Sequence, residues 1–374
     1  MFFTQVVGLS AAQVGLGLTL AGVVTFFCAI PLGRLTDRVG AKRLWALTAL
    51  AQAVFYLLWP LASGFLSFLA VTIALEVVAT GSRAARGAYT LSVFAGTDRI
   101  RSLAFMRAAR NIGYTLGALM GGLALATGSL DAIRAVPVLT AGILAVNALL
   151  VSRLPSLDNV AAPTARDGLF NPSALRNPGF LAMSACSGVL GTNQVLLNVV
   201  IPLWLVEQTD APRVLLAWLS GTNTVLAVLL QVRASRGSET IPGALRAFRI
   251  SGAFFVLSCL IVLITHDTVG WVTIGLVWVG HITVTGAELY QSAGSWGLVA
   301  ELSDPARLGE YQGAAQLGST AGSVWAPAAY TFLAINWGTP GWLLIAVIIV
   351  LATVGIHPAA RAASRHLQQH SDHV

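Results

Sequence analysis

The segment PLGRLTDRVGAKRLW, residues 31–45, sets five charged side chains and two glycines between long apolar stretches of the chain. This concentration stands out because only 10% of the 374 residues are charged, whereas 56% are hydrophobic. A soluble globular protein carries about 25% charged residues. With less than half that supply, the chain cannot cover its surface with polar groups. The composition therefore predicts a protein whose natural solvent is a lipid bilayer.

The apolar stretches are long enough to cross the hydrocarbon core, which requires about 20 residues of helix. They lack the alternation of polar and apolar residues that marks the strands of a membrane β-barrel. An all-α, polytopic fold is therefore predicted. Eleven stretches are expected to span the membrane, namely residues 12–32, 44–62, 65–93, 103–127, 132–153, 179–206, 213–233, 246–266, 269–297, 311–335 and 339–357.

The positions of the basic residues predict how these helices are oriented, because arginine and lysine accumulate in cytoplasmic loops. Alternate loops hold 16 basic residues against 2 in the remaining loops. This asymmetry predicts that the loop 153–178 and the C-terminal tail are cytoplasmic. A single lysine, Lys42, among 22 basic residues indicates a bacterial genome, and hence a bacterial inner (plasma) membrane. A nucleic-acid role for the net charge of +7 is not favoured, because the basic residues form no stripe or tail.

The first residues, MFFTQVVGLSAAQVG, carry no charge and no basic flank, although the predicted orientation starts them outside the cell. This favours the interpretation that most of a preceding helix is missing, with a true eleven-span protein as the alternative. A polar, proline-containing linker then separates two bundles. The expected domains are the N-terminal bundle 1–153, the linker 154–178, and the C-terminal bundle with a short tail, 179–374.

The opening segment resembles a family signature. GRLTDRVGAKR fits G-x-x-x-D-R-x-G-x-K-R, the loop between the second and third helices of the major facilitator superfamily. The matching residues are Gly33, Asp37, Arg38, Gly40, Lys42 and Arg43. Arg83 to Gly87 resembles the family's R-x-x-x-G in the fourth helix, and Gly113, Gly117, Gly121 and Gly122 resemble its glycine series in the fifth. The proline that marks drug and proton antiporters is absent, which weakens an exporter assignment.

The resemblance implies a two-bundle fold of twelve helices, with about eleven in this chain, which transports a small solute by alternating access. It also implies that Asp37 contacts the opposite half and helps to latch the outward-open state. A loop that serves only to anchor the topology is the alternative. The repeated spacing of Gly113, Gly117 and Gly121 predicts a seam at which another helix approaches closely.

Ionisable and amide side chains inside the predicted spans are candidates for a transport pathway, because burying them in lipid is costly. Glu76 and Arg83 are seven residues apart on one helix face. His281 and Glu288 lie on a second polar face, together with Thr285, Ser292 and Ser295. A third span carries Asn193, Gln194 and Asn198, with Pro202 able to bend it. By the family's numbering these are the fourth, tenth and seventh helices, which line its central cavity.

Each candidate has a plainer interpretation. Glu76 and Arg83 can form a structural ion pair, the amides can bond neighbouring helices, and His281 can be a satisfied interior residue. Glu288 is the best candidate for a protonatable carboxylate, because apolar surroundings are expected to disfavour its charged form. Arg107 and Arg110 are expected to extend toward the interface, with contact to an anion as the alternative. The stripe on span 311–335 is expected to serve close packing and contains Gln312, Gln316, Ser319 and Ser323.

The sequence thus predicts a secondary transporter for a small solute, monomeric, proton-coupled and outward-directed. No phosphate-binding loop, zinc-protease helix or serine-nucleophile motif occurs, so neither enzyme chemistry nor a cofactor or metal is expected. The alternative is a truncated, non-transporting remnant or a membrane-embedded interaction protein, because one wall of the cavity is absent.

Overall fold

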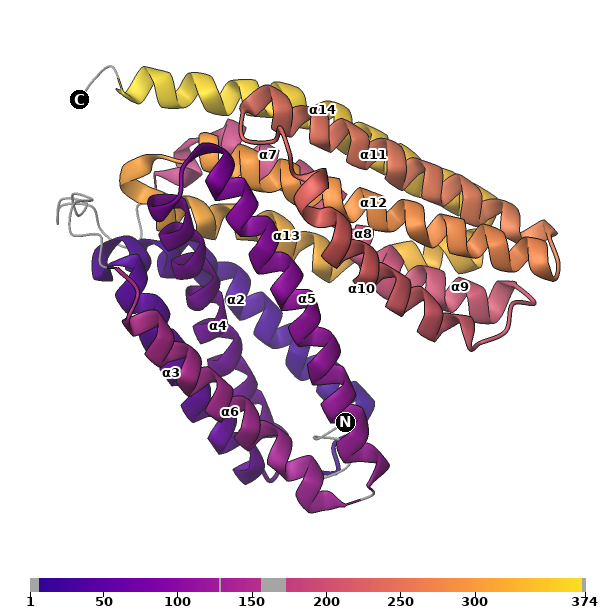
Figure 1. The fold of residues 1–374 in the computed structure, drawn as a ribbon, viewed down its shortest axis with the longest axis horizontal. Coiled ribbons are helices and arrows are strands. Elements are labelled where there is room, and N and C mark those ends of the chain that lie inside the picture. Colours follow the sequence, from indigo (N-terminus) through magenta and orange to yellow (C-terminus); the bar gives the residue numbers. More distant parts are fainter. Residues whose placement is uncertain (1–6, 128, 156–172, 372–374) are drawn as a thin grey trace. The chain divides into compact units, whose positions relative to one another are not determined.

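The computed structural model describes residues 7–127, 129–155 and 173–371, and in these ranges it contains helices and no strands (Figure 1). The long helices before the linker are α2 (Ala11–Val39), α3 (Ala41–Leu58), α4 (Phe65–Val93), α5 (Gly96–Ala126) and α6 (Leu130–Ser152). After the linker come α7 (Pro178–Leu190), α8 (Asn193–Val195), α9 (Ile201–Gln208), α10 (Leu215–Ala234), α11 (Ile241–Ile264), α12 (Trp271–Glu301), α13 (Leu308–Thr331) and α14 (Thr339–Ser371).

The eleven predicted spans all fall on these helices, so the all-α membrane class is confirmed. Among the described residues, nine helices or helical runs are long and apolar enough to cross a membrane. The two predicted spans outside that set are α5 and α13. α5 carries Arg107 and Arg110 within its length, and α13 carries a stripe of amides and hydroxyls. Both are nevertheless continuous helices, of 31 and 24 residues.

The chain divides into two compact units that depart from simple chain order. Unit 1 comprises residues 1–93, 114–176 and 303–316, and unit 2 comprises residues 94–113, 177–302 and 317–374. Two helices are therefore divided between the units. The first part of α5, up to Gly113, belongs to unit 2 and its remainder to unit 1. The first part of α13, up to Gln316, belongs to unit 1 and its remainder to unit 2. The expected linker, 154–178, lies mostly outside the described residues.

Unit 1 is built on the packing of α2 against α4 and of α3 against both α4 and α6. Small residues allow these helices to approach closely. Gly17 on α2 faces the ring of Phe68 on α4, which is 1% exposed. A side chain at Gly81 on α4 would meet Leu32 and Thr48 at ordinary van der Waals distance.

Unit 2 is built on the pair α11 and α12, with α10 on α12 and with α14 beside both α11 and α7 (Figure 1). Hydroxyl groups bond the central pair across the interface. Ser251 donates to the carbonyl of Ala287 at 2.7 Å, and Ser258 donates to that of Gly280 at 2.7 Å. Such bonds satisfy polar groups that lipid cannot, and they fix the register of the two helices.

The sixth long span, Pro178–Gln208, is interrupted rather than bent at one residue. α7 ends at Leu190, a turn follows, and a π-helical turn at Leu196–Val200 precedes α9. Pro202 lacks an amide hydrogen, so the helix cannot continue with regular bonding at this position. Two side chains bind the interruption: Gln291 of α12 donates to the carbonyl of Ser187 at 3.3 Å, and Thr192 bonds to Tyr330 at 3.1 Å.

The opening segment forms the end of α2, the turn and the start of α3. Gly40 lies at the turn with φ of 93°, a left-handed conformation that glycine adopts without strain. Its amide hydrogen bonds to the carbonyl of Thr36 at 2.9 Å and closes α2. Gly40 of the sequence signature is therefore explained by the positive φ of this turn.

Candidate functional site

Asp37 caps the first turn of α13 within unit 1. Its Oδ1 accepts a hydrogen bond from the amide of Gly309 at 2.6 Å, and its Oδ2 accepts one from Glu310 at 2.8 Å. The first amides of a helix have no partner inside the helix, and the helix dipole favours a negative charge there. Asp37 supplies both the acceptors and the charge, to a residue pair more than 270 positions away along the chain.

The side chain of Glu310 forms a second layer beneath this cap. Its Oε2 pairs with Arg34 Nε at 3.4 Å, and the two side chains are only 1% and 5% exposed. Its other oxygen accepts a hydrogen bond from the backbone amide of Ala174, near the end of the linker. One residue thus joins the end of α2, the start of α13 and the end of the linker.

Gly33 allows this close approach. A β-carbon at Gly33 would lie 2.8 Å from the carbonyl carbon of Gly309, so no larger residue fits without movement of backbone. Of the other signature residues, Arg38 and Arg43 are exposed and Lys42 is half-buried. The positions fit a turn whose interior holds Gly33 and Asp37 and whose exterior carries the remaining charges.

Glu76 and Arg83 lie one above the other on α4, as the spacing predicts. Glu76 Oε2 is 3.8 Å from Arg83 Nη2, and the side chains are 47% and 44% exposed. Arg83 makes a shorter bond to Thr80 Oγ1, at 2.8 Å. With its amide oriented to satisfy both groups, Gln316 accepts from Arg83 Nε at 2.6 Å. Arg83 is therefore well held, whereas the ion-pair partner of Glu76 among the described residues is this arginine, at 3.8 Å.

The first two amides of the α13 stripe, Gln312 and Gln316, have different roles. Gln316 binds Arg83, and the Gln312 side chain lies against Gly87, where a β-carbon would be 2.7 Å from its amide carbon. The family's R-x-x-x-G pattern thus provides an arginine for one glutamine and a glycine for the other. For Gln316, the expectation of simple close packing is wrong.

Glu288 on α12 is the centre of a polar network in unit 2. Its carboxylate contacts Arg107 of α5 in an ion pair, and it accepts a hydrogen bond from Asn223 Nδ2 of α10 at 2.9 Å. Arg107 also bonds to Ser292, one turn further along α12, and Asn223 bonds to Thr285 at 3.2 Å. The Arg107 and Glu288 side chains are 11% and 6% exposed.

Two expectations are corrected by this network. The surroundings of Glu288 are polar rather than apolar, so the stated reason for its protonation is wrong. Arg107 does not extend to the interface but turns inward to a carboxylate 181 positions away. Spacing along α5 could not reveal this, because the partner lies on a helix that is distant in sequence.

The remaining polar candidates are not joined to Glu288. His281 is 2% exposed and lies near the backbone of Leu219. Asn193 is 1% exposed and donates to the carbonyl of Leu190, whereas Gln194 and Asn198 are exposed on the other side of the interrupted helix. Asn198 donates to the carbonyl of Gln194 at 2.8 Å. The three amides thus do not share one face.

The glycine series on α5 leaves open space at its β-carbon positions among the described residues. Apart from the helix's own backbone and the adjoining residues, no described atom lies within 4 Å of the positions that β-carbons would take at Gly113, Gly117, Gly121 and Gly122. Close glycine contacts occur elsewhere instead. In unit 1, Gly313 approaches Ala29, and in unit 2, Gly188 approaches Gly318. The helix seam at these α5 glycines stays a prediction.

No cluster of three or more metal-ligating side chains occurs among the residues with a described position. Asn223 and Arg107 are the two partners of Glu288 that the sequence analysis did not assign to the pathway. Asn223 lies within an apolar span and could have been found from that fact alone. The arrangement offers a set of partly exposed and buried charges within long helices.

These features define a polytopic helical membrane protein with charged networks inside its helices. A sequence profile of the Major Facilitator Superfamily matches residues 1–327. The chain belongs to this superfamily, and its fold is that of a secondary transporter. The family and its structural relatives point to a transporter rather than an enzyme.

Solved structures share the fold at low sequence identity. A bacterial homologue of the iron transporter ferroportin, in its outward-facing state, superposes with a TM-score of 0.73 at 15% identity, covering 96% of this chain and 93% of that one. The human organic anion transporter MFSD10 (TETRAN) gives 0.64 at 18%, with 95% and 87% covered. The transporter FucP in the outward conformation gives 0.67 at 15%, with 96% and 92% covered.

Proposed function

We propose that this protein moves a small solute across the membrane by alternating access, coupled to protons. The observation that carries the proposal is the buried pair of Glu288 and Arg107, inside helices of a transporter fold. A charged pair within the hydrocarbon depth is costly, and it is retained where it serves a pathway. Protonation of Glu288 would remove the charge that holds Arg107, so a proton can act on the contact between α12 and α5.

Glu76 is the second carboxylate of the proposed pathway. It is 47% exposed, and its nearest cation is 3.8 Å away. A solute or a proton can therefore reach it without displacing a tightly bound partner. We propose that Glu76 binds solute or proton, with Arg83 held beside it by Thr80 and Gln316. Of the other candidates, Gln194 and Asn198 offer exposed amides, whereas Asn193 and His281 are buried and would support the pathway from inside.

The switch loop supplies the conformational part of this proposal. Asp37 binds the start of α13, and its release would free the first turn of that helix. We propose that this cap and the Arg34–Glu310 pair stabilise one state of the transport cycle. We also propose that the proton gradient drives the solute outward.

Orientation, location and assembly complete the proposal. The distribution of arginines favours a cytoplasmic C-terminus in a bacterial plasma membrane, and the protein is proposed to act as a monomer. A reporter that is active only in the cytoplasm, fused after Val374, tests the orientation. A signal from a periplasmic reporter at the same position contradicts it.

Flux in proteoliposomes tests the coupling. The protein is reconstituted with a pH-sensitive dye inside, and a panel of sugars, amino acids, organic anions and amines is added outside. We expect one class to change the internal pH with the wild-type protein and not with Glu288→Gln or Glu76→Gln. Glu207→Gln is a matched control, since this exposed carboxylate on α9 lies outside the network. Solute uptake that is equal with and without a pH gradient contradicts proton coupling, and no uptake of any solute favours the non-transporting alternative.

A further inference from the structure

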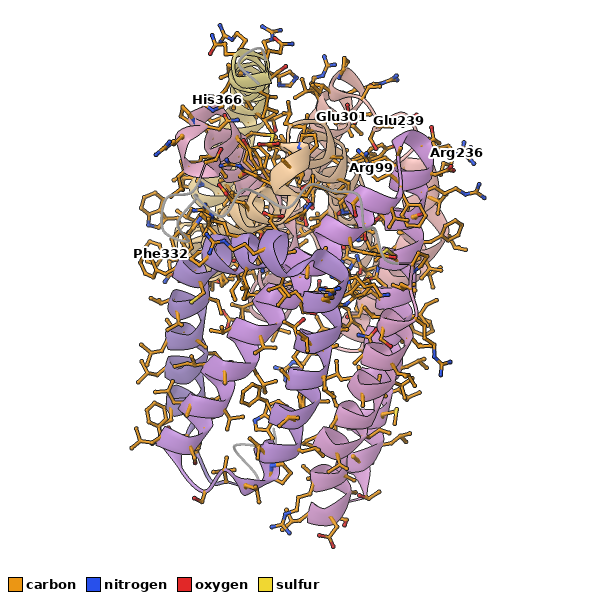
Figure 2. All side chains as sticks on the ribbon, turned by 90° about the vertical axis from the view of Figure 1, so that its left-hand side faces the viewer. Arg99, Arg236, Glu239, Glu301, Phe332 and His366 are labelled. Carbon is orange, nitrogen blue, oxygen red and sulfur yellow. The ribbon has the colours of Figure 1, made fainter. Side chains whose placement is uncertain are left out.

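Six exposed arginines of unit 2 lie at the end of α10, on α11 and on α14, at one end of the unit. α10 ends and α11 begins there, and α14 ends beside α11. The residues are Arg233, Arg236, Arg246, Arg249, Arg361 and Arg365. None of their side chains forms a hydrogen bond or an ion pair with any residue that the structure describes. Figure 2 shows Arg236 and His366 at this end.

The register of α11 and α14 places arginines of both helices at one level. The helices are antiparallel neighbours, and a β-carbon at Gly252 would lie 3.0 Å from Thr353 Cβ. Arg246 is six residues from Gly252 and Arg361 is eight from Thr353, which corresponds to about 9 Å and about 12 Å along the helices. Arg246 and Arg361 are thus close to level with each other.

Nearby carboxylates do not neutralise this cluster. Glu239 bonds to Thr97, at 3.5 Å, and Glu301 pairs with Arg99, at 3.5 Å. Arg246 and Arg249 are three residues apart on α11, and Arg361 and Arg365 are four apart on α14. Like charges at these spacings disfavour a helix unless another charge compensates them. The opposite end of unit 2 differs, because Glu207, Asp210 and Asp267 stand there with Arg213.

Apolar side chains continue from the arginines toward the middle of the membrane. On α14, Val354 is 64% exposed and Leu351 is 66% exposed, about 10 and 15 Å before Arg361 along the helix. On α11, Leu257 is 44% exposed, about 16 Å beyond Arg246. A molecule with an anionic head and an apolar tail can contact both the arginines and the apolar side chains. A soluble anion can contact only the arginines.

We propose that this face, formed by α11 and α14, binds an acidic phospholipid. The guanidinium groups of Arg246, Arg249, Arg361 and Arg365 hold its phosphate, and the apolar side chains beside them hold its acyl chains. Arginine suits this task because its planar fork binds phosphate oxygens in pairs. Basic surfaces at the ends of membrane helices recognise anionic headgroups by the same chemistry.

Lipid addition to the purified full-length protein tests the proposal. Thermal unfolding is followed in a neutral detergent while phosphatidylglycerol or phosphatidylcholine is added, and native mass spectrometry counts the retained lipids. We expect phosphatidylglycerol, and not phosphatidylcholine, to stabilise the wild-type protein. The variant Arg246→Gln/Arg249→Gln/Arg361→Gln/Arg365→Gln is expected to need at least about tenfold more phosphatidylglycerol. Arg213→Gln at the opposite end is the matched control and is expected to respond like the wild type.

Several outcomes overturn the proposal. They are equal stabilisation of the wild type by both lipids, an unchanged phosphatidylglycerol response in the fourfold variant, or a response to inorganic phosphate equal to that of the lipid. Should the fourfold variant fail to fold, the pairs Arg246→Gln/Arg361→Gln and Arg249→Gln/Arg365→Gln replace it. Salt is then raised for the wild type, since an electrostatic site must weaken as charges are screened. A phosphatidylglycerol response that is insensitive to salt refutes the assignment.

Discussion

Removal of Arg107 tests the network around Glu288 most directly. The side chains of this pair are 11% and 6% exposed, so water screens them little. Replacing Arg107 by Met leaves the Glu288 carboxylate buried with Asn223 as its remaining partner. Loss of one member of a buried ion pair costs about 3–5 kcal/mol, because the other charge stays uncompensated. We expect Arg107→Met and Glu288→Met each to lower the free energy of unfolding by that order.

The double variant measures the coupling energy between Arg107 and Glu288. Arg107→Met/Glu288→Met removes both charges, so it should be less destabilised than the sum of the single variants. We expect a coupling energy of at least about 1.5 kcal/mol from the double-mutant cycle. Unfolding in mixed detergent micelles with increasing sodium dodecyl sulfate provides the four free energies.

A second ion pair on the same two helices serves as the control. Arg99 of α5 and Glu301 of α12 are 3.5 Å apart, but their side chains are 16% and 39% exposed. A pair of this kind contributes about 0–1 kcal/mol. The same cycle on Arg99 and Glu301 should therefore give the smaller coupling. Additive effects of Arg107→Met and Glu288→Met, or a larger coupling in the exposed pair, refute the reasoning.

Three further predictions concern unit 1. Asp37→Ala leaves two amides of α13 without an acceptor, at about 1–3 kcal/mol for each, and should lower the thermal midpoint more than Asp37→Asn does; equal midpoints contradict the cap. Gly33→Ala forces the backbones of α2 and α13 apart and should destabilise the protein by about 1–3 kcal/mol. Gly117→Ala, with open space around it, should be neutral or slightly stabilising. A lower thermal midpoint for Gly117→Ala than for Gly33→Ala contradicts the packing. Arg34→Leu should cost about 3–5 kcal/mol, and Arg34→Leu/Glu310→Leu should recover most of it; no recovery in chemical unfolding means that the pair is not coupled.

The class of protein and the extent of its spans follow from the sequence, because hydrophobic length is a local property. A stretch of about 20 apolar residues spans the bilayer regardless of its neighbours. The seven-residue spacing of Glu76 and Arg83 and the turn at Gly40 are equally local, and the structure agrees with both. The signature around Asp37 could be recognised for the same reason, because its residues lie in one continuous segment.

Only the tertiary structure decided which charges meet. Asp37 binds amides more than 270 residues away, and Arg107 reaches a carboxylate 181 residues away. These partners depend on how the helices pack and on where glycines such as Gly33 let backbones approach, and no spacing within one helix encodes that. The same rule explains the α5 glycines: four-residue spacing indicates a face that can pack, but a partner must be brought to it by the fold. Hydrophobicity therefore places the helices in the membrane, and packing between distant segments determines the chemistry inside it.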